Sequence, residues 1–137
     1  MLDEYIKLFS GYDGDFGIAD MSKAKLDSER NKLKPDYEWA GRPITPVDYK
    51  NHIDGKISIG IQPCRLNKTA QFACIDIDPK NYSEFKIKNY LTKFEQYKLP
   101  LVPLLSKSGG LHCYVFLKEP IPAADIIEAL KAFLLPL

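Results

Sequence analysis

Two aspartates, Asp76 and Asp78, lie in an otherwise apolar segment that covers residues 72–79. Side chains alternate across a strand, so both carboxylates are expected on one face, with their Cβ atoms about 6–7 Å apart. Burying an unpaired carboxylate is costly, so this spacing predicts a compensating charge nearby. Two carboxylates at this separation can share a pair of divalent cations, as in phosphoryl and nucleotidyl transfer. Asp76 and Asp78 are therefore candidate metal ligands and catalytic residues.

Pro79 indicates where this strand ends. Proline cannot donate to a strand ladder, so the strand should stop just after Asp78. The carboxylates would then lie at the carboxyl edge of a sheet, where open α/β folds bind their ligands. The same residues also fit a simpler interpretation, in which Asp76 and Asp78 are a strand-end cap and a solvated turn residue.

A second polar segment follows Leu101–Leu105, an apolar run that is typical of a strand in a buried sheet. Its small and basic residues are Ser106, Lys107, Ser108, Gly109 and Gly110. Successive amides in a glycine turn, together with hydroxyls and a lysine charge, can form a phosphate-binding concavity. His112 opens the next strand, on the face of Tyr114 and Phe116, where it can donate to a phosphate or orient a reacting oxygen. The alternatives are plain turn-forming serines and a partly buried, hydrogen-bonded histidine.

These two motifs, in this order and with a helix between them, resemble the catalytic core of the archaeo-eukaryotic primases, the primase-polymerase superfamily. The resemblance is greatest to primase domains of phage, mobile-element and conflict-system proteins. Residues 52–63 also resemble the strand that leads into the first motif of that family. The likeness covers about His52–Pro120, half of the chain.

The resemblance implies template-directed nucleotidyl transfer by a DNA primase or polymerase that uses Mg²⁺ or Mn²⁺. Nucleoside triphosphates and a DNA template or primer would be its partners, with a fused or separate helicase or nuclease. Asp76 and Asp78 match the family's metal-binding carboxylates. Ser106 and His112 match its nucleotide-binding motif, and Ser108, Gly109 and Gly110 would shape the loop. Lys107 stands where relatives often carry arginine. Lysine keeps the positive charge but lacks the bidentate hydrogen-bonding fork of a guanidinium.

The chain departs from the family at a third acidic motif, which relatives carry on a later strand. The sequence ends at Leu137, and its late acids are Glu119, Asp125 and Glu128, in or beside an expected helix. We therefore expect residues 1–137 to form a single domain, the amino-terminal part of a longer catalytic unit. Alone, it would bind metal or nucleotide without necessarily turning over.

The expected fold class is α+β, with one mixed central sheet and flanking helices. The resemblance implies a primase-polymerase-like, RRM-related core that is incomplete at its carboxyl terminus. Lys56–Ile61 alternates as a strand, and residues 67–69 would link it, as in a hairpin, to the Asp-x-Asp strand. Thr45 is the expected N-cap of a helix that ends before Gly55. The other expected helices are Leu2–Phe9, Asp20–Lys34, Ser83–Lys98 and Ala123–Leu134.

With a net charge of only +1, the overall electrostatic field of the molecule does not indicate nucleic-acid binding. Local basic clusters are present in two segments, which we interpret mainly as solvated helix faces. They comprise Lys23, Lys25, Arg30, Lys32 and Lys34 in one, and Lys80, Lys86, Lys88, Lys93 and Lys98 in the other. Arg42 and Arg65 are further candidates for triphosphate or template contacts, although any loop contains arginines.

The three cysteines, Cys64, Cys74 and Cys113, include no Cys-x-x-Cys pair and are odd in number, so they indicate neither a zinc ribbon nor a disulfide framework. Parity puts Cys74 on the face of Asp76, so a soft-metal site with His112 is a minor alternative. No apolar run of about 18 residues exists and the amino terminus is acidic. We expect no membrane partner and a cytoplasmic location in a bacterial, archaeal or virus-infected cell.

Two other functional classes fit parts of this pattern. A metal-dependent glycosyltransferase also uses an Asp-x-Asp at a strand end to bind a nucleotide sugar, but the Ser-Gly-Gly-x-His segment does not belong to that pattern. A non-catalytic nucleotide or nucleic-acid binding module would keep the scaffold without the third carboxylate.

Overall fold

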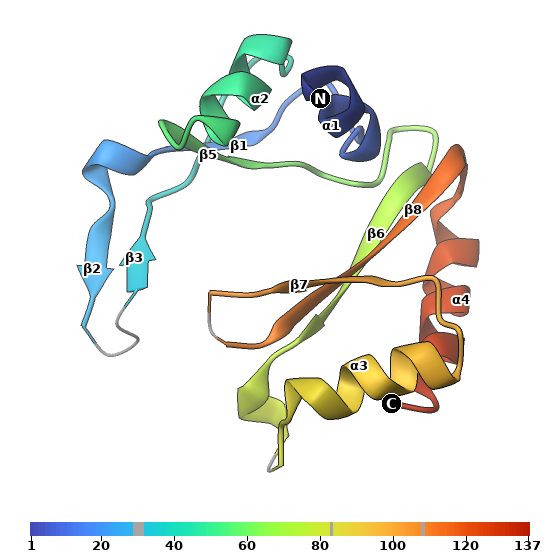
Figure 1. The fold of residues 1–137 in the computed structure, drawn as a ribbon. Helices are drawn as coiled ribbons and strands as arrows, with labels where there is room; N and C mark the ends of the chain where they lie inside the picture. Colours follow the sequence, from blue (N-terminus) through green and yellow to red (C-terminus); the bar gives the residue numbers. More distant parts are fainter. Residues whose placement is uncertain (29–31, 83, 108) are drawn as a thin grey trace.

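The computed structural model describes residues 1–28, 32–82, 84–107 and 109–137. Its described residues form an α+β fold of α-helices and small antiparallel sheets, so the expected fold class is confirmed (Figure 1). The helices are α1 (Leu2–Leu8), α2 (Pro46–Ile53), α3 (Ile87–Gln96) and α4 (Ala123–Leu134), with 3-10 turns η1 (Met21–Lys23) and η2 (Pro79–Asn81). The strands are β1 (Gly17–Asp20), β2 (Lys25–Asp27), β3 (Lys32–Lys34), β4 (Glu38–Trp39), β5 (Ile57–Gly60), β6 (Thr69–Ile77), β7 (Val102–Leu105) and β8 (Leu111–Pro122).

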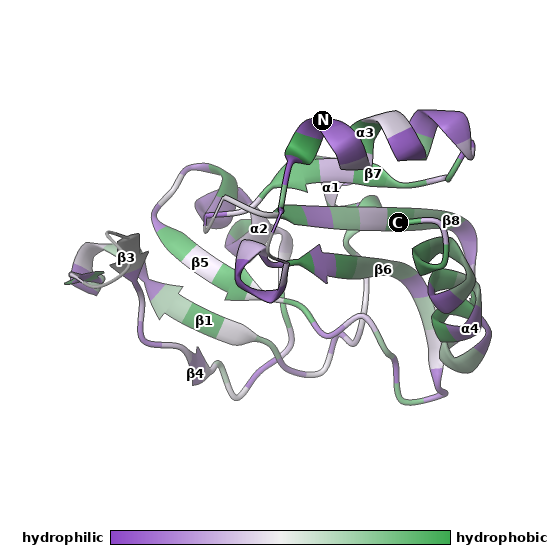
Figure 2. Cartoon of the chain, turned by 90° about the horizontal axis from the view of Figure 1, so that it is seen from below, coloured by the Kyte–Doolittle hydropathy of each residue, from purple (hydrophilic) through white to green (hydrophobic). Residues whose placement is uncertain are grey.

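The larger sheet has the order β6-β8-β7, and every pair in it is antiparallel. Its strands alternate between polar and apolar residues, while α4 beside them is largely apolar (Figure 2). One face of the sheet carries Ile75, Ile77, Cys113 and Val115, which pack with Phe94 of α3 and with α4 in the main core. The other face therefore carries the alternate residues of β6 and β8, and this open face holds the candidate site.

The smaller sheet has the order β4-β1-β5, and α2 packs against β5. Helix α1 and the residue after it connect this part to the larger sheet. Phe9 places its ring 5.3–5.5 Å, centroid to centroid, from the rings of Phe72, Tyr114 and Phe116. Tyr5 contacts Tyr49 of α2 edge to face at 6.2 Å. These aromatic contacts fix the two sheets relative to one another.

The helix expected over Asp20–Lys34 is wrong. The segment contains the end of β1, the 3-10 turn η1 and the β2–β3 hairpin, in which Lys25 pairs with Lys34. Its lysines suit a helix, but the segment lacks an apolar stripe that a helix could bury, so strand pairing overrides propensity. Asp20 accepts hydrogen bonds from the amide and hydroxyl of Ser22, which starts the turn instead.

The single mixed central sheet is also wrong, because the strands divide among separate antiparallel sheets in the described residues. β5 pairs with β1, whose residues fall beside and within the segment expected to be helical. With β1 as its partner, β5 does not form the expected hairpin with β6. Residues 67–69 instead turn the chain into β6, with Lys68 at a positive φ of 62°.

The remaining elements largely agree with expectation. Thr45 is the N-cap of α2, whose bounds match, and α4 has the expected range. α3 begins at Ile87, later than expected, and the proposed cap at Ser83 lies outside the described residues. β7 is confirmed as a strand but is an exposed edge rather than part of a buried sheet, which suits Pro103 because proline cannot donate to a second neighbour. None of the helices in the described ranges combines the length and the apolar character needed to cross a bilayer.

Candidate active site

Asp76 and His112 lie directly opposite each other on the antiparallel strands β6 and β8. His112 Nε2 is 3.7 Å from Asp76 Oδ1, which is too long for a hydrogen bond. The Asp76 side chain is 66% exposed and the His112 side chain 43% exposed. Both point to the open face, while Ile75 and Ile77 point into the core. The strand register thus brings together one residue from each sequence motif, with polar atoms directed to solvent.

Asp78 follows the last residue of β6 with extended backbone angles, φ −87° and ψ 125°. Since Ile77 between them is buried, this extended residue continues the alternation and keeps Asp78 on the side of Asp76. Its Oδ1 accepts the backbone N–H of Lys80 at 3.0 Å and caps η2. The strand-end cap that the sequence allowed is therefore present, and it uses one of the two carboxylate oxygens.

The loop between β7 and β8 is closed by hydrogen bonds of Ser106. The buried Ser106 hydroxyl accepts the N–H of Gly110 at 3.0 Å, and its carbonyl accepts the N–H of Gly109 at 3.1 Å. Ser106 N–H donates in turn to the Gly110 carbonyl at 2.9 Å. Two of the amides proposed to hold phosphate therefore already have partners within the loop.

Gly110 fixes this loop against the end of β6. A Cβ atom at this position would lie 2.2 Å from the carbonyl oxygen of Ile77 and 2.8 Å from Pro79 Cδ, so only glycine fits. Gly109 has a positive φ of 82° with open space where its Cβ would be, so it is needed for conformation rather than room. The Gly110 contact with Ile77 holds the loop beside the backbone between Asp76 and Asp78.

Lys107 is the charged residue of this loop, and it is exposed. Its N–H has no hydrogen-bond partner among the described residues. Ser108, also expected in the phosphate site, lies outside the described residues. The loop therefore offers the Lys107 ammonium and N–H to an anion, while the amides of Gly109 and Gly110 are used internally.

The open face changes from polar to aromatic along β6 and β8. The Asp76–His112 pair is followed, two residues along each strand, by Cys74 opposite Tyr114, and then by Phe72 opposite Phe116. Successive pairs on one face lie about 7 Å apart along the strands. Polar groups thus lie at the loop end and aromatic rings at the end covered by α1.

A cleft of about 320 Å³ separates this aromatic part from the smaller sheet and its helices. Its lining residues are Tyr5, Phe9, Tyr49, His52, Ile59, Ile61, Phe72, Leu104 and Tyr114. Two of them flank His112, since Leu104 pairs with it in register and the Tyr114 ring centroid is 6.4 Å from the imidazole centroid. The cleft therefore adjoins the polar pair.

Sequence reasoning placed Tyr114 on the face of His112 but did not find this cleft. Tyr5, Phe9 and Tyr49 come from segments distant in sequence and carry no local motif. Their role depends on how α1 and α2 pack, which no spacing within either segment indicates.

The two strand cysteines lie on opposite faces of the larger sheet: Cys74 shares the open face with Asp76, whereas Cys113 is buried in the core. Burial, reinforced by the Asp76 charge, raises the pKa of Cys74 to about 11. Burial also raises the pKa of Cys113 to about 11. Since Cys113 points into the core, Cys74 is the one of these two thiols that could join Asp76 and His112, which does not favour the soft-metal alternative.

A hard cation fits the oxygen donors better. Mg²⁺ is usually held by one or two carboxylates, with waters and substrate phosphates as its other ligands. The Asp76 carboxylate is exposed and accepts no hydrogen bond from a described residue, so it can serve as such a ligand. No group of three potential ligands occurs among the described residues. The late acids Glu119, Asp125 and Glu128 are exposed on β8 and α4.

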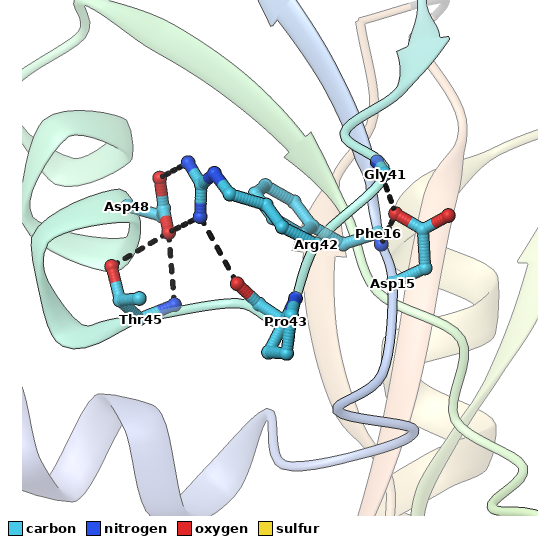
Figure 3. A network of polar contacts seen from close by, with 7 residues as sticks. All are labelled: Asp15, Phe16, Gly41, Arg42, Pro43, Thr45 and Asp48. Atoms are coloured by element: carbon cyan, nitrogen blue, oxygen red, sulfur yellow. Dashed lines mark hydrogen bonds and ion pairs between the residues drawn. The ribbon is translucent and has the colours of Figure 1, made fainter.

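Arg42 and Arg65, considered as triphosphate contacts, have structural partners. Arg42 donates to both oxygens of the buried Asp48, at 2.7 and 2.8 Å, and Asp48 also accepts from the amide and hydroxyl of Thr45 (Figure 3). Hydrogen bonding from Arg42 holds the pKa of Asp48 well below its usual range. Arg65 Nη2 donates to Ser10 and Gln71 at 3.2 Å. These arginines fix the entry to α2 and the start of β6.

Comparison with known proteins supports the family resemblance. A comparison with curated proteins found no match. A family model described as the archaeo-eukaryotic primase domain of the TOTE conflict system matches residues 17–135, which include both motifs and most of the fold. The chain therefore belongs to the family of archaeo-eukaryotic primase domains found in TOTE conflict systems.

Proposed function

We propose that this domain carries out template-directed nucleotidyl transfer as part of a DNA primase-polymerase. The observation that carries the proposal is the direct opposition of Asp76 and His112 on the open face, beside a loop fastened by Gly110. A histidine and a carboxylate at this spacing fit an anionic substrate that arrives with a cation. Family membership supports a nucleotidyltransferase-like activity.

In this proposal Asp76 and the second oxygen of Asp78 hold Mg²⁺ or Mn²⁺. When bound, the ion supplies positive charge at the attacking 3′-hydroxyl and the departing pyrophosphate. His112 Nε2 donates to a phosphate oxygen, and Lys107 adds a positive charge at the loop. Ser106 and Gly110 hold the loop beside the two carboxylates, through their mutual hydrogen bonds and the close approach of Gly110 to Ile77.

The same proposal orients the nucleotide along the open face. The triphosphate lies at the loop end, where Asp76, His112 and Lys107 are found. The sugar and base extend toward the cleft, where Tyr114 and Phe9 offer aromatic surface. Stacking on an aromatic ring suits any base, so this part of the site would not select one base over another.

The test compares Asp76→Asn with Glu128→Gln, a matched removal of an exposed charge on α4. Incorporation of a labelled deoxynucleotide on a primed template is measured with Mn²⁺ and with Mg²⁺. We expect Asp76→Asn to lower incorporation on the order of 100-fold or more, because metal charge contributes several kcal/mol to the transition state. Its thermal midpoint should match that of wild type, since the side chain is exposed. Full activity of a variant lacking both Asp76 and Asp78 carboxylates would refute the metal assignment.

A non-catalytic binding module remains the second candidate, favoured by the presence of only two nearby carboxylates among the described residues. Calorimetric titration with a deoxynucleoside triphosphate separates the two. The catalytic proposal expects binding that requires Mn²⁺ and is weakened by Asp76→Asn. Metal-independent DNA binding without product would support the module, and preferential binding of a UDP-sugar would support the glycosyltransferase.

A further inference from the structure

The smaller sheet carries an aromatic and glycine surface on the side that does not hold Ile57 and Ile59. In the strand register Trp39 of β4 lies opposite Gly17 of β1, and Gly17 lies opposite Gly60 of β5. One row across three strands therefore contains a single side chain, an indole that is 63% exposed. Neighbouring glycines leave the sheet beside the indole uncovered.

Tyr37 extends this surface. It precedes Trp39 by two residues, so its side chain lies on the same face. Its hydroxyl forms a hydrogen bond with Ser58 of β5, and its ring carbon Cδ1 would be 3.6 Å from a Cβ atom on Gly17. The ring is thus held across the sheet while 54% of the residue remains exposed.

These residues line a shallow groove of about 410 Å³. Gly17, Tyr37, Trp39 and Gly60 form it together with Glu38, Ile61 and Gln62. Glu38 is the acidic residue of the groove, but it lies between two same-face aromatics, so its side chain alternates toward the opposite face. Two exposed aromatic rings over bare backbone indicate a ligand with flat, apolar faces.

The neighbouring β2–β3 hairpin supplies positive charge next to this groove. Lys25 and Lys34 are directly opposite in the antiparallel register, and both are exposed. Like charges at opposed positions destabilise a hairpin, and neither lysine forms an ion pair with a residue that the structure describes. Lys34 is three residues before Tyr37, so their Cα atoms are at most about 11 Å apart. A polyanion that contacts both lysines would relieve the repulsion.

We propose that this surface, defined by Tyr37, Trp39, Gly17 and Gly60 with Lys25 and Lys34, binds single-stranded nucleic acid. A base stacks on Trp39 over the glycine row, and phosphates lie near the two lysines. A single strand fits better than a duplex, because stacking on a side chain requires an unpaired base. Naming this strand as the template rests on the proposed function, whereas the binding itself does not.

Trp39 is the only tryptophan of the chain, so its fluorescence reports directly on this surface. Titration with a short oligothymidine should quench the emission. Trp39→Ala should weaken binding of a labelled oligonucleotide, measured by anisotropy, about 10- to 100-fold, and Trp39→Phe should restore most of it. Tyr97→Ala, which removes an exposed aromatic residue after α3, is the matched control and should leave affinity unchanged.

The charge component is tested by the salt dependence of binding. A Lys25→Gln/Lys34→Gln double variant should reduce the slope of log affinity against log salt by about 1.4, since each phosphate contact on a single strand contributes about 0.7. The control is Lys86→Gln/Lys88→Gln at the start of α3, which should not alter the slope. Equal slopes for all three proteins would overturn the role of the hairpin.

The Asp76→Asn variant separates this inference from the proposed function. It should lose incorporation and still show Trp39 quenching with wild-type affinity. Absence of quenching, tighter binding of a duplex of the same length, or binding of a protein or polysaccharide in preference to the oligonucleotide would overturn the inference. None of these results would bear on whether Asp76 and Asp78 hold metal.

Discussion

Substituting Gly110 by alanine tests whether activity depends on the position of the β7–β8 loop or only on its stability. The new Cβ atom would lie 2.2 Å from the Ile77 carbonyl oxygen, whereas ordinary contact begins near 3.4 Å. To restore ordinary contact, the loop or the end of β6 must move by about 1.2 Å, the difference between these two distances. Because Ile77 O and Pro79 Cδ belong to backbone and a proline ring, neither can rotate away. The loop would then be displaced from Asp76 and Asp78.

Displacements of about 1 Å in a site that positions reacting groups can cost on the order of 100-fold in rate. We therefore expect Gly110→Ala to reduce incorporation by about that factor and to weaken metal-dependent triphosphate binding. Its stability should fall by about 1–3 kcal/mol, as for other overpacked positions. Stability is measured by urea unfolding, and binding by calorimetry.

Gly109→Ala is the matched control for this prediction. It introduces the same methyl group one residue earlier, where no atom lies within 4 Å, but at a φ of 82°. Left-handed strain should cost about 1–2 kcal/mol without moving the loop toward β6. Similar losses of activity in both variants would show that loop stability, and not the contact with Ile77, controls the site, and would refute the reasoning.

The remaining predictions concern the nucleotide, the metal, the Arg42–Asp48 pair and the aromatic contacts of α1. His112→Ala should weaken triphosphate binding about tenfold, as expected for loss of a hydrogen bond to a charged group, and unchanged affinity in calorimetry would count against its assignment. Mn²⁺ binding measured by electron paramagnetic resonance should be weak alone and stronger with triphosphate, so tight binding without nucleotide would contradict a site completed by phosphates. The pKa of Asp48 in the folded protein is lowered from 3.8, so the stabilisation from the ionised carboxylate is present above about pH 4 and is lost as the pH falls toward the folded pKa. The urea midpoint of Asp48→Asn should therefore depend less on pH in that acid range than the midpoint of wild type. Parallel curves for the two proteins would exclude the Arg42–Asp48 pair as a source of acid sensitivity. Phe9→Ala should lower the free energy of unfolding by about 2–3 kcal/mol, because Phe9 contacts three rings yet is only partly buried, and a smaller loss would show that α1 is not held by these contacts.

Local chemistry explains which features of the fold could be predicted. The end of β6 at Ile77, the capping of α2 by Thr45 and the range of α4 follow from proline placement, a cap residue and apolar periodicity. Each signal lies within a few residues of the structure that it specifies. Predicting that Asp76 and His112 lie near each other required the family resemblance as well as local signals, because the β6–β8 register brings the two motifs together.

Features that depend on distant segments could not be predicted. Residues 20–34 carry lysines that suit a helix, yet the described part of the segment contains the end of β1, the turn η1 and the strands β2 and β3, which pair with each other. The pairing of β5 with β1 separates β5 from β6 and divides the expected central sheet. Arg42 was a candidate ligand until its distance from Asp48 was known, because six residues of separation do not indicate a bidentate contact.

Metal and nucleotide binding should depend on each other in the proposed site. Asp78 already gives one oxygen to Lys80 N–H, so the two aspartates can supply few of the six ligands that Mg²⁺ requires. The amides of Gly109 and Gly110 are also occupied, so among the described residues of the site His112 and Lys107, together with the cation, would be the partners of the phosphate. Each ligand therefore lacks part of its coordination until the other arrives, and linkage requires that each raise the affinity of the other by the same factor. On this account, the small number of carboxylates makes the metal site conditional on substrate.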